Sequence, residues 1–60
     1  MSGDRRREQI IATAVDHFSR HGFKGTTTKK IAEAAGVSEA MVFRHFASKD
    51  ELYEAILHSK

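Results

Sequence analysis

The 60-residue sequence contains no cysteine and no proline. Without cysteine the chain can form neither a disulfide nor a thiolate-ligated zinc or iron–sulfur site. A domain of this length buries only about 60% of the surface that its unfolded chain exposes, so its core is small. The sequence therefore predicts one small domain that depends on further polypeptide or on a second subunit for support.

Long apolar runs are also missing. No stretch approaches the roughly 20 apolar residues of a membrane span or the 7 to 15 of a signal peptide. The chain also has no glycine-rich phosphate loop and no strand–turn–helix elbow that would present a nucleophilic serine. We therefore expect a soluble, cytoplasmic protein that is not an enzyme, has no membrane partner and needs no cofactor.

An excess of one charge is nearly absent, because ten lysines and arginines are set against eight aspartates and glutamates, for a formal net charge of +2. This excess is too small to indicate a nucleic-acid partner. The distribution is more informative: positions 22–49 contain five basic and two acidic residues, whereas positions 50–60 contain one basic and three acidic residues. Such a basic middle segment is compatible with a nucleic-acid-binding surface and also with a solvated face.

Two of the four histidines, His17 and His21, have the four-residue spacing of a helical metal site. No third ligand is apparent, and no glutamate follows His17 as in the H-E-x-x-H pattern. We therefore expect these histidines on an exposed helix face, without a metal.

Glycines and capping residues divide the chain into four helical segments. In the first, over about positions 5–21, apolar residues recur at the three- and four-residue spacing of a buried stripe. These residues are Ile10, Ile11, Ala14, Val15 and Phe18. Gly22 can close this helix in the left-handed conformation, with Phe23 folding back on the last turn.

Three shorter helices are expected over about positions 28–35, 38–46 and 49–58. Hydroxyl residues that can cap them precede or begin each one, since their oxygens accept from free first-turn amides: Thr26 to Thr28, Ser38 and Ser48. The residues expected to face inward are Ile31, Ala32, Ala35, Val42, Phe46, Leu52, Tyr53, Ile56 and Leu57. The prediction is an all-α fold, a three-helix core plus the start of a fourth, linking helix.

The segment 31–38 joins two of these helices by a short turn. Ala32 and Ala35 stand where the helices must approach closely, and Gly36 stands where the backbone reverses. This is the pattern of a helix-turn-helix, in which the first helix braces on the DNA backbone and the second enters the major groove. The same turn occurs in ordinary helical hairpins, so the turn alone does not distinguish a DNA-binding helix-turn-helix from a hairpin. The residues around it carry that distinction.

The surrounding residues resemble the N-terminal domain of the TetR family of transcriptional regulators, over essentially the whole chain. The residues that carry the resemblance are Gly25, Thr27, Thr28, Ile31, Ala32, Ala35 to Ser38, Phe43, His45, Phe46, Lys49 and Leu52. The resemblance implies a homodimer formed by a larger C-terminal domain, absent from this chain, which also binds a small-molecule effector. Phe43 departs from the family, which most often has tyrosine there, and so lacks a hydroxyl that would reach a phosphate. Met41 replaces smaller or hydroxylated residues.

Lysines occupy helix starts, where the exposed amides carry roughly half a positive charge and favour acidic residues. Lys29 and Lys30 fall in the first turn of the second helix, and Lys49 in that of the fourth. Lysine beside free amides forms an anion site that suits DNA phosphates. The alternative is that these lysines extend into water at a cost of a few tenths of a kcal/mol.

The expected DNA contacts divide by role, since phosphate contacts position a protein and base contacts specify sequence. The expected phosphate ligands are Thr27, Thr28, Arg44, His45 and Lys49, with Lys29 also a candidate for a guanine edge. The start and outer face of the third helix should approach base edges through Ser38, Glu39, Ala40, Met41 and Phe43. Glu39 either accepts from a cytosine amino group or complements its helix dipole, and Phe43 either touches a thymine methyl or packs beside Val42.

These observations favour a DNA-binding transcriptional regulator, a ligand-responsive repressor that binds double-stranded DNA at a palindromic operator as a dimer. Two alternatives share the helical fold. One is an adaptor whose apolar fourth-helix face docks on another protein, and the other is a nuclease or metal enzyme.

Overall fold

The computed structural model describes residues 2–58 of the chain, with side chains from Arg5 onward. These residues form four helices and no strand: α1 (Ser2–His21), α2 (Thr28–Ala35), α3 (Glu39–His45) and α4 (Lys49–His58). The all-α prediction is confirmed. The first helix begins about one turn earlier than expected. Ser38 is the N-cap of the third helix, as the sequence predicts, and Phe46, expected as its last residue, is its C-cap.

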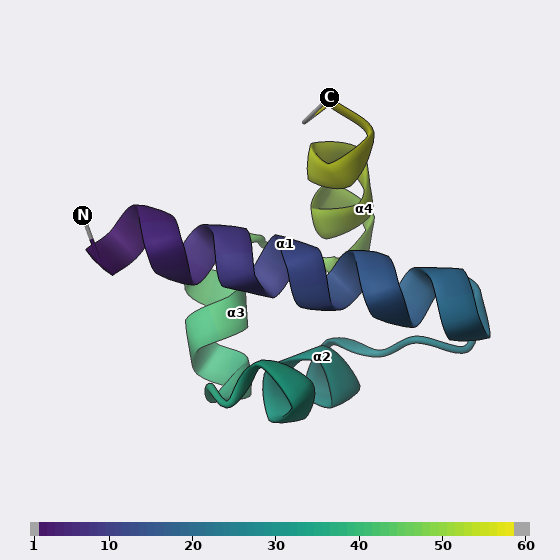
Figure 1. The fold of residues 1–60 in the computed structure, drawn as a ribbon, viewed down its shortest axis with the longest axis horizontal. Coiled ribbons are helices and arrows are strands. Elements are labelled where there is room, and N and C mark those ends of the chain that lie inside the picture. The colour runs from purple at the N-terminus through teal and green to yellow at the C-terminus, as the bar shows by residue number, and fades with distance from the viewer. Residues whose placement is uncertain (1, 59–60) are drawn as a thin grey trace.

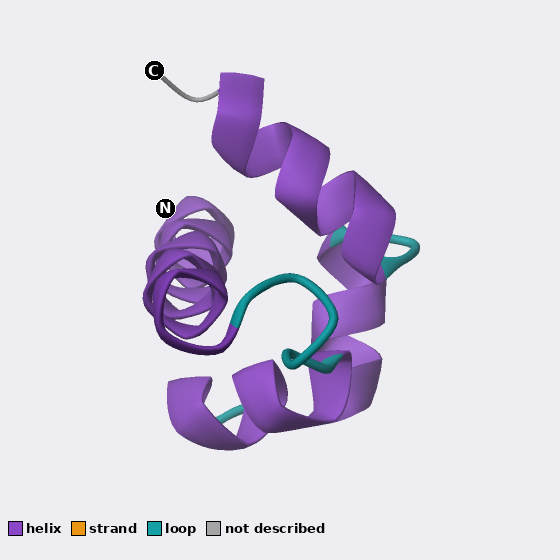
Figure 2. Cartoon of the chain, turned by 90° about the vertical axis from the view of Figure 1, so that its right-hand side faces the viewer, coloured by secondary structure: helices purple, strands orange, loops and turns teal. Residues whose placement is uncertain are grey.

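The three shorter helices form an arc around one side of α1. Figure 1 shows α1 as the long horizontal helix, with α2 below it and α4 rising behind it. Seen along α1, the path runs from α2 through α3 to α4 and leaves the far side of α3 turned away from α1 (Figure 2). None of the helices within residues 2–58 is both long and apolar enough to cross a bilayer.

The core takes residues from all four helices. Six side chains at its centre are at most 3% exposed: Ile10, Ala14, Ile31, Ala32, Val42 and Phe46, and Leu52 joins them from α4 with no exposed surface. The small side chains of Ala14 and Ala32 allow the helices to approach closely. Burial of these seven residues fixes how α2 and α3 sit on α1, and so determines the orientation of the helix-turn-helix.

Two apolar residues expected to face inward are exposed instead, Val15 at 44% and Leu57 at 59%. Each lies five residues after a fully buried anchor, Ile10 in α1 and Leu52 in α4. Five residues correspond to about 140° around a helix, because one residue turns it by about 100°. Both residues thus lie at the edges of their apolar stripes, beyond the reach of the neighbouring helices. Tyr53, also expected to face inward, is exposed as well, at 38%.

The turn between α2 and α3 forms as the sequence predicts. Gly36 adopts a left-handed conformation, with φ of 74°, and its amide donates to the Glu33 carbonyl. The Val37 amide donates to the Ala32 carbonyl at 3.0 Å, which completes a Schellman motif. Ser38 then caps α3 by accepting from the Met41 amide at 3.1 Å. Local hydrogen bonds therefore hold the turn between the two helices.

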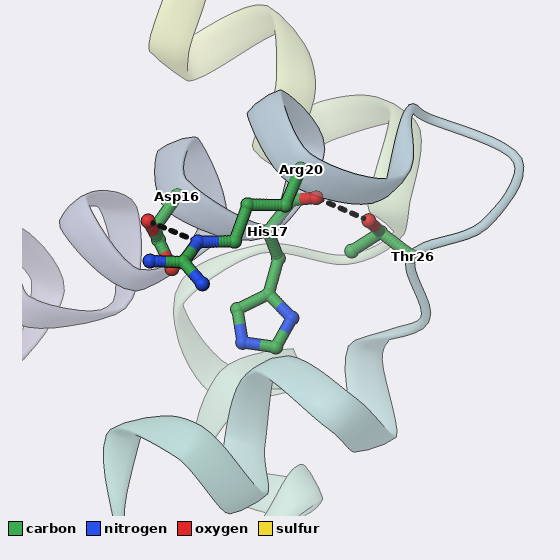
Figure 3. A network of polar contacts seen from close by, with 4 residues as sticks. All are labelled: Asp16, His17, Arg20 and Thr26. Atoms are coloured by element: carbon green, nitrogen blue, oxygen red, sulfur yellow. Dashed lines mark hydrogen bonds and ion pairs between the residues drawn. The ribbon is translucent and has the colours of Figure 1, made fainter.

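The longer α1–α2 connection is anchored by a buried threonine. Thr26 has no exposed surface, and its hydroxyl lies 3.0 Å from the His17 carbonyl (Figure 3). The Gly22 carbonyl lies 2.9 Å from the same hydroxyl, which can donate to either. The Phe23 ring stacks on Phe18 with centroids 5.6 Å apart, as the sequence predicts. The connection is therefore an ordered loop held against the end of α1.

Candidate nucleic-acid interface

The outer face of α3 is open to solvent. Glu39, Ala40, Phe43 and Arg44 are exposed, whereas Val42 points into the core with no exposed surface. Met41 and His45 lie at the border of this face and are partly buried. The division follows the helical period, since residues three and four apart share a face. A short helix whose outer surface carries charged, apolar and aromatic groups is free to enter a groove.

The start of α2 has unpaired amides and two exposed lysines. Thr27 caps this helix by accepting from the Lys30 amide at 3.1 Å. The first turn of α2, all of it within the described residues, contains no acidic side chain, and both Lys29 and Lys30 are exposed. The positive end of the helix dipole and two ammonium groups thus lie together at one surface, where they attract anions.

The two helix starts adjoin. The Thr28 hydroxyl donates to the Glu39 carboxylate at 2.8 Å, across the gap between the first turns of α2 and α3. Sequence reasoning assigned these two side chains to a phosphate and to a base, and did not foresee the bond between them. Each retains free acceptor positions, because a carboxylate offers about four lone-pair sites. The bond fixes the position of the Glu39 side chain on the outer face.

A shallow hollow connects this surface to the start of α4. It is lined by Thr27, Thr28, Phe43, Ala47, Ser48 and Lys49. Four of these six residues were predicted to contact DNA, and the structure brings them together from three separate segments. Phe43 is 46% exposed and lines this hollow, so packing in the core beside Val42 is ruled out for it.

Lys49 lies at this surface but points inward. Its ammonium donates to the Phe23 carbonyl at 2.6 Å and to the Thr26 carbonyl at 2.9 Å, and it lies 4.2 Å from the centroid of the Phe23 ring. The next two residues, Asp50 and Glu51, supply the acidic first turn that a helix start favours. The sequence predicts a lysine beside free amides at the start of α4. In the structure Lys49 is instead partly buried and bonded to two backbone carbonyls.

Several supporting contacts carried no signal in the sequence. The Gln9 amide donates to the Ala35 carbonyl at 3.0 Å, and the Arg7 guanidinium lies 5.2 Å from the centroid of the Phe46 ring. Both contacts tie α1 to the helix-turn-helix. They join residues more than 25 positions apart, so no local pattern could indicate them.

The histidine pair lies on α1. The His17 and His21 rings have centroids 5.7 Å apart, and the buried Nδ1 atom of His17 has no hydrogen-bond partner. Within the part of the chain that the structure describes, no group of three or more metal-binding side chains gathers. The exposed face expected here is correct for His21 but only partly so for His17, which is partly buried.

A family model described as bacterial regulatory proteins, tetR family, matches residues 10–56. The chain belongs to the tetR family. The matched region covers the buried core, the starts of α2 and α3 and the α2–α3 turn. Members of the tetR family are DNA-binding regulators rather than enzymes.

Individual relatives agree with the family model. The chain is 44% identical over 52 residues to the HTH-type transcriptional regulator RutR of Escherichia coli K12. The aligned region covers 87% of this chain and 24% of RutR. It is 51% identical over 47 residues to the HTH-type transcriptional regulatory protein RaaS of Mycobacterium tuberculosis, covering 78% of this chain and 22% of RaaS. The HTH-type transcriptional repressor AcnR of Corynebacterium efficiens is 36% identical over 50 residues, covering 83% of this chain and 27% of AcnR. The chain thus spans about a quarter of the length of these relatives.

Proposed function

We propose that this chain is the DNA-binding domain of a cytoplasmic transcriptional regulator, a ligand-responsive repressor that places α3 in the major groove of operator DNA. The observation that carries the proposal is the exposed outer face of α3 beside the cationic start of α2. Two relatives are named as a transcriptional regulator and a transcriptional repressor, which agrees with this role.

In this proposal the start of α2 binds one strand of the backbone. Lys29, Lys30 and the free first-turn amides pair with phosphates, and Thr27 and Arg44 add contacts on either side. Ser38, Glu39, Ala40, Met41 and Phe43 then approach base edges. Thr28 and His45, both partly buried, border the same groove.

A single helix of seven residues reads few base pairs, so selectivity requires two domains on a palindromic site. We propose that the full-length protein is a homodimer. The expected C-terminal domain would provide the dimer contacts and the site for a small-molecule effector. Binding of the effector would change the affinity for the operator.

The decisive experiment measures operator binding by the full-length protein at several salt concentrations. Selection from a random duplex pool first supplies the operator, and an inverted repeat is expected. Each phosphate contact contributes about −0.9 to the slope of log K against log salt on duplex DNA. Lys29→Ala and Arg44→Ala should each weaken binding and reduce the steepness of this slope by about two such increments, one from each subunit of the dimer.

The matched control is Arg20→Ala, which removes one positive charge from α1, where Arg20 pairs with Asp16 at 3.0 Å. This variant should retain the slope of the unmodified protein. Binding that is indifferent to salt would contradict the proposal and favour the adaptor. Equal slopes for all three variants and the unmodified protein would contradict the docking through α2 and α3.

A further inference from the structure

Lys49 is held inside the domain by three separate contacts. Two of its three N–H donors are used by the Phe23 and Thr26 carbonyls, at 2.6 and 2.9 Å, and the Phe23 ring lies 4.2 Å away. Its side chain is partly buried, in contrast to the exposed side chain of Lys29. Charge-assisted hydrogen bonds of this length are the strong ones. A phosphate would have to compete with them for the ammonium.

The two carbonyls belong to the α1–α2 loop, which leads into the start of α2. Thr26 directly precedes Thr27, the N-cap of α2. A trans peptide unit directs its carbonyl and its amide N–H to opposite sides. The bond to the Thr26 carbonyl therefore turns the Thr27 amide N–H away from Lys49. It also fixes the orientation of the Thr26–Thr27 peptide plane, which directly precedes α2.

The same bonds also affect the charge at the surface. Carbonyl oxygens carry partial negative charge and repel phosphates, whereas amide N–H groups attract them. The Phe23 and Thr26 carbonyls both accept from the Lys49 ammonium, which offsets their partial negative charge close to Thr27 and Thr28. Those two threonines line one hollow with Lys49 itself.

We infer that Lys49 is a positioning residue for DNA binding: it fastens the α1–α2 loop to α4, so that the amides and lysines at the start of α2 face the phosphates. This inference rests on the proposed function and refines it, because it takes Lys49 out of the set of phosphate ligands. The ligand that the positioned surface takes is the phosphate backbone of duplex DNA.

The first test uses the unmodified full-length protein and requires no variant. An amine-acylating reagent followed by mass spectrometry reports how accessible each lysine is. Lys29 should react rapidly in the free protein and be protected by operator duplex. Lys49 should react several-fold more slowly than Lys29 already in the free protein, with little further protection by DNA. Equal reactivity of the two lysines in the free protein would overturn the inference.

The second test compares Lys49→Met with Lys29→Met, which make the same chemical change at the two sites. Lys29→Met should lower the steepness of the salt slope by about 1.8, because the dimer loses one phosphate contact in each subunit. Lys49→Met should weaken operator binding about tenfold and leave the slope unchanged, because it misplaces the surface without removing a phosphate contact. Lys49→Arg, which keeps the charge and the donors, should restore most of the affinity.

The outcomes separate the two proposals. A slope that falls equally in Lys49→Met and Lys29→Met would make Lys49 a phosphate ligand and overturn this inference alone, as would unchanged affinity in Lys49→Met. Failure of the unmodified protein to bind any duplex would overturn the proposed function, and the acylation rates of the free protein would still test the contacts of Lys49. If Lys49→Met does not fold, those rates decide the inference.

Discussion

Gly25 tolerates no side chain because of a close contact and not because of its backbone conformation. Within residues 2–58 the glycines with positive φ are Gly22 and Gly36. A Cβ atom at this position would lie 2.4 Å from the carbonyl oxygen of His21, a backbone atom that cannot move without disturbing the end of α1. The loop therefore passes so close to α1 that only a hydrogen fits. Thr26, the next residue, lies close enough for its hydroxyl to reach the His17 carbonyl of α1 and the Gly22 carbonyl just after the helix.

We expect Gly25→Ala to lower the free energy of unfolding by about 1–3 kcal/mol, the usual cost of forcing an extra carbon into a packed site. Urea unfolding followed by circular dichroism measures the change. The control is Lys24→Ala, an exposed neighbour whose replacement should stay within about 0.5 kcal/mol. Equal stabilities of the two variants would show that the loop can move away from His21.

Lysines 29 and 49 illustrate how one residue type at similar positions takes two roles. Both lie within the first turn of a helix. Acidic residues follow Lys49 and not Lys29, but this local difference does not indicate which backbone groups either lysine contacts. The difference arises because the α1–α2 loop passes over the start of α4, where its carbonyls meet the ammonium of Lys49. No such carbonyls face Lys29, which is exposed.

Helix α3 is too short to form on its own, since isolated helices below about 12 residues are marginal in water. Its seven residues are held by Val42 and the C-cap residue Phe46 in the core and by the Ser38 cap at its start. The cap is therefore a large part of what keeps the first turn of α3, with Glu39 and Ala40, in a helical conformation.

We expect Ser38→Ala to destabilise the domain by about 1 kcal/mol, within the usual range for the loss of a cap. Ser38→Asp should retain stability, because aspartate caps equally well. It should nevertheless weaken operator binding, since it adds a negative charge at the edge of the proposed DNA surface. Thermal unfolding and operator titration measure the two effects. Operator affinity equal to that of the unmodified protein in Ser38→Asp would place the start of α3 away from the phosphates.

The four helices share one core, and only part of each apolar stripe enters it. Leu52 has no exposed surface, whereas Leu57, on the same helix, is 59% exposed. Val15 and Leu57 therefore expose apolar surface to solvent. Equal residue types on one helix therefore contribute very different amounts to stability.

We expect Leu52→Ala to cost about 2–5 kcal/mol. A 60-residue domain has a total stability of roughly 3–9 kcal/mol at the usual value per residue, so this change brings it close to unfolding. Leu57→Ala should change stability by less than about 0.5 kcal/mol. Denaturant unfolding of the chain compares the two. A large loss in Leu57→Ala would mean that another copy of the chain covers this residue in solution.

The charge of the molecule, +2 in total, is a poor guide to its surface. Lys29, Lys30 and Arg44 are exposed on or near the α2–α3 surface, while Lys49 is engaged inside and Arg20 pairs with Asp16 on α1. The distribution of these charges, which the fold creates, is what supports the proposed function.

Much of this architecture follows from interactions within a few residues of one another. Apolar spacing located the four helices, the Ser38 and Thr27 caps followed from their side-chain chemistry, and the left-handed Gly36 followed from the reversal required after Ala35. Each of these features depends on bonds that span three to five residues, and a linear sequence displays such neighbours directly.

Packing between helices decided the remainder. It left Val15 and Leu57 exposed at the edges of their stripes, turned Phe43 outward, joined Thr28 to Glu39 and directed Lys49 to carbonyls 23 and 26 positions earlier. Such contacts depend on the angle and separation at which whole helices meet. That geometry is set by the volumes of all the core side chains together, which no local pattern contains.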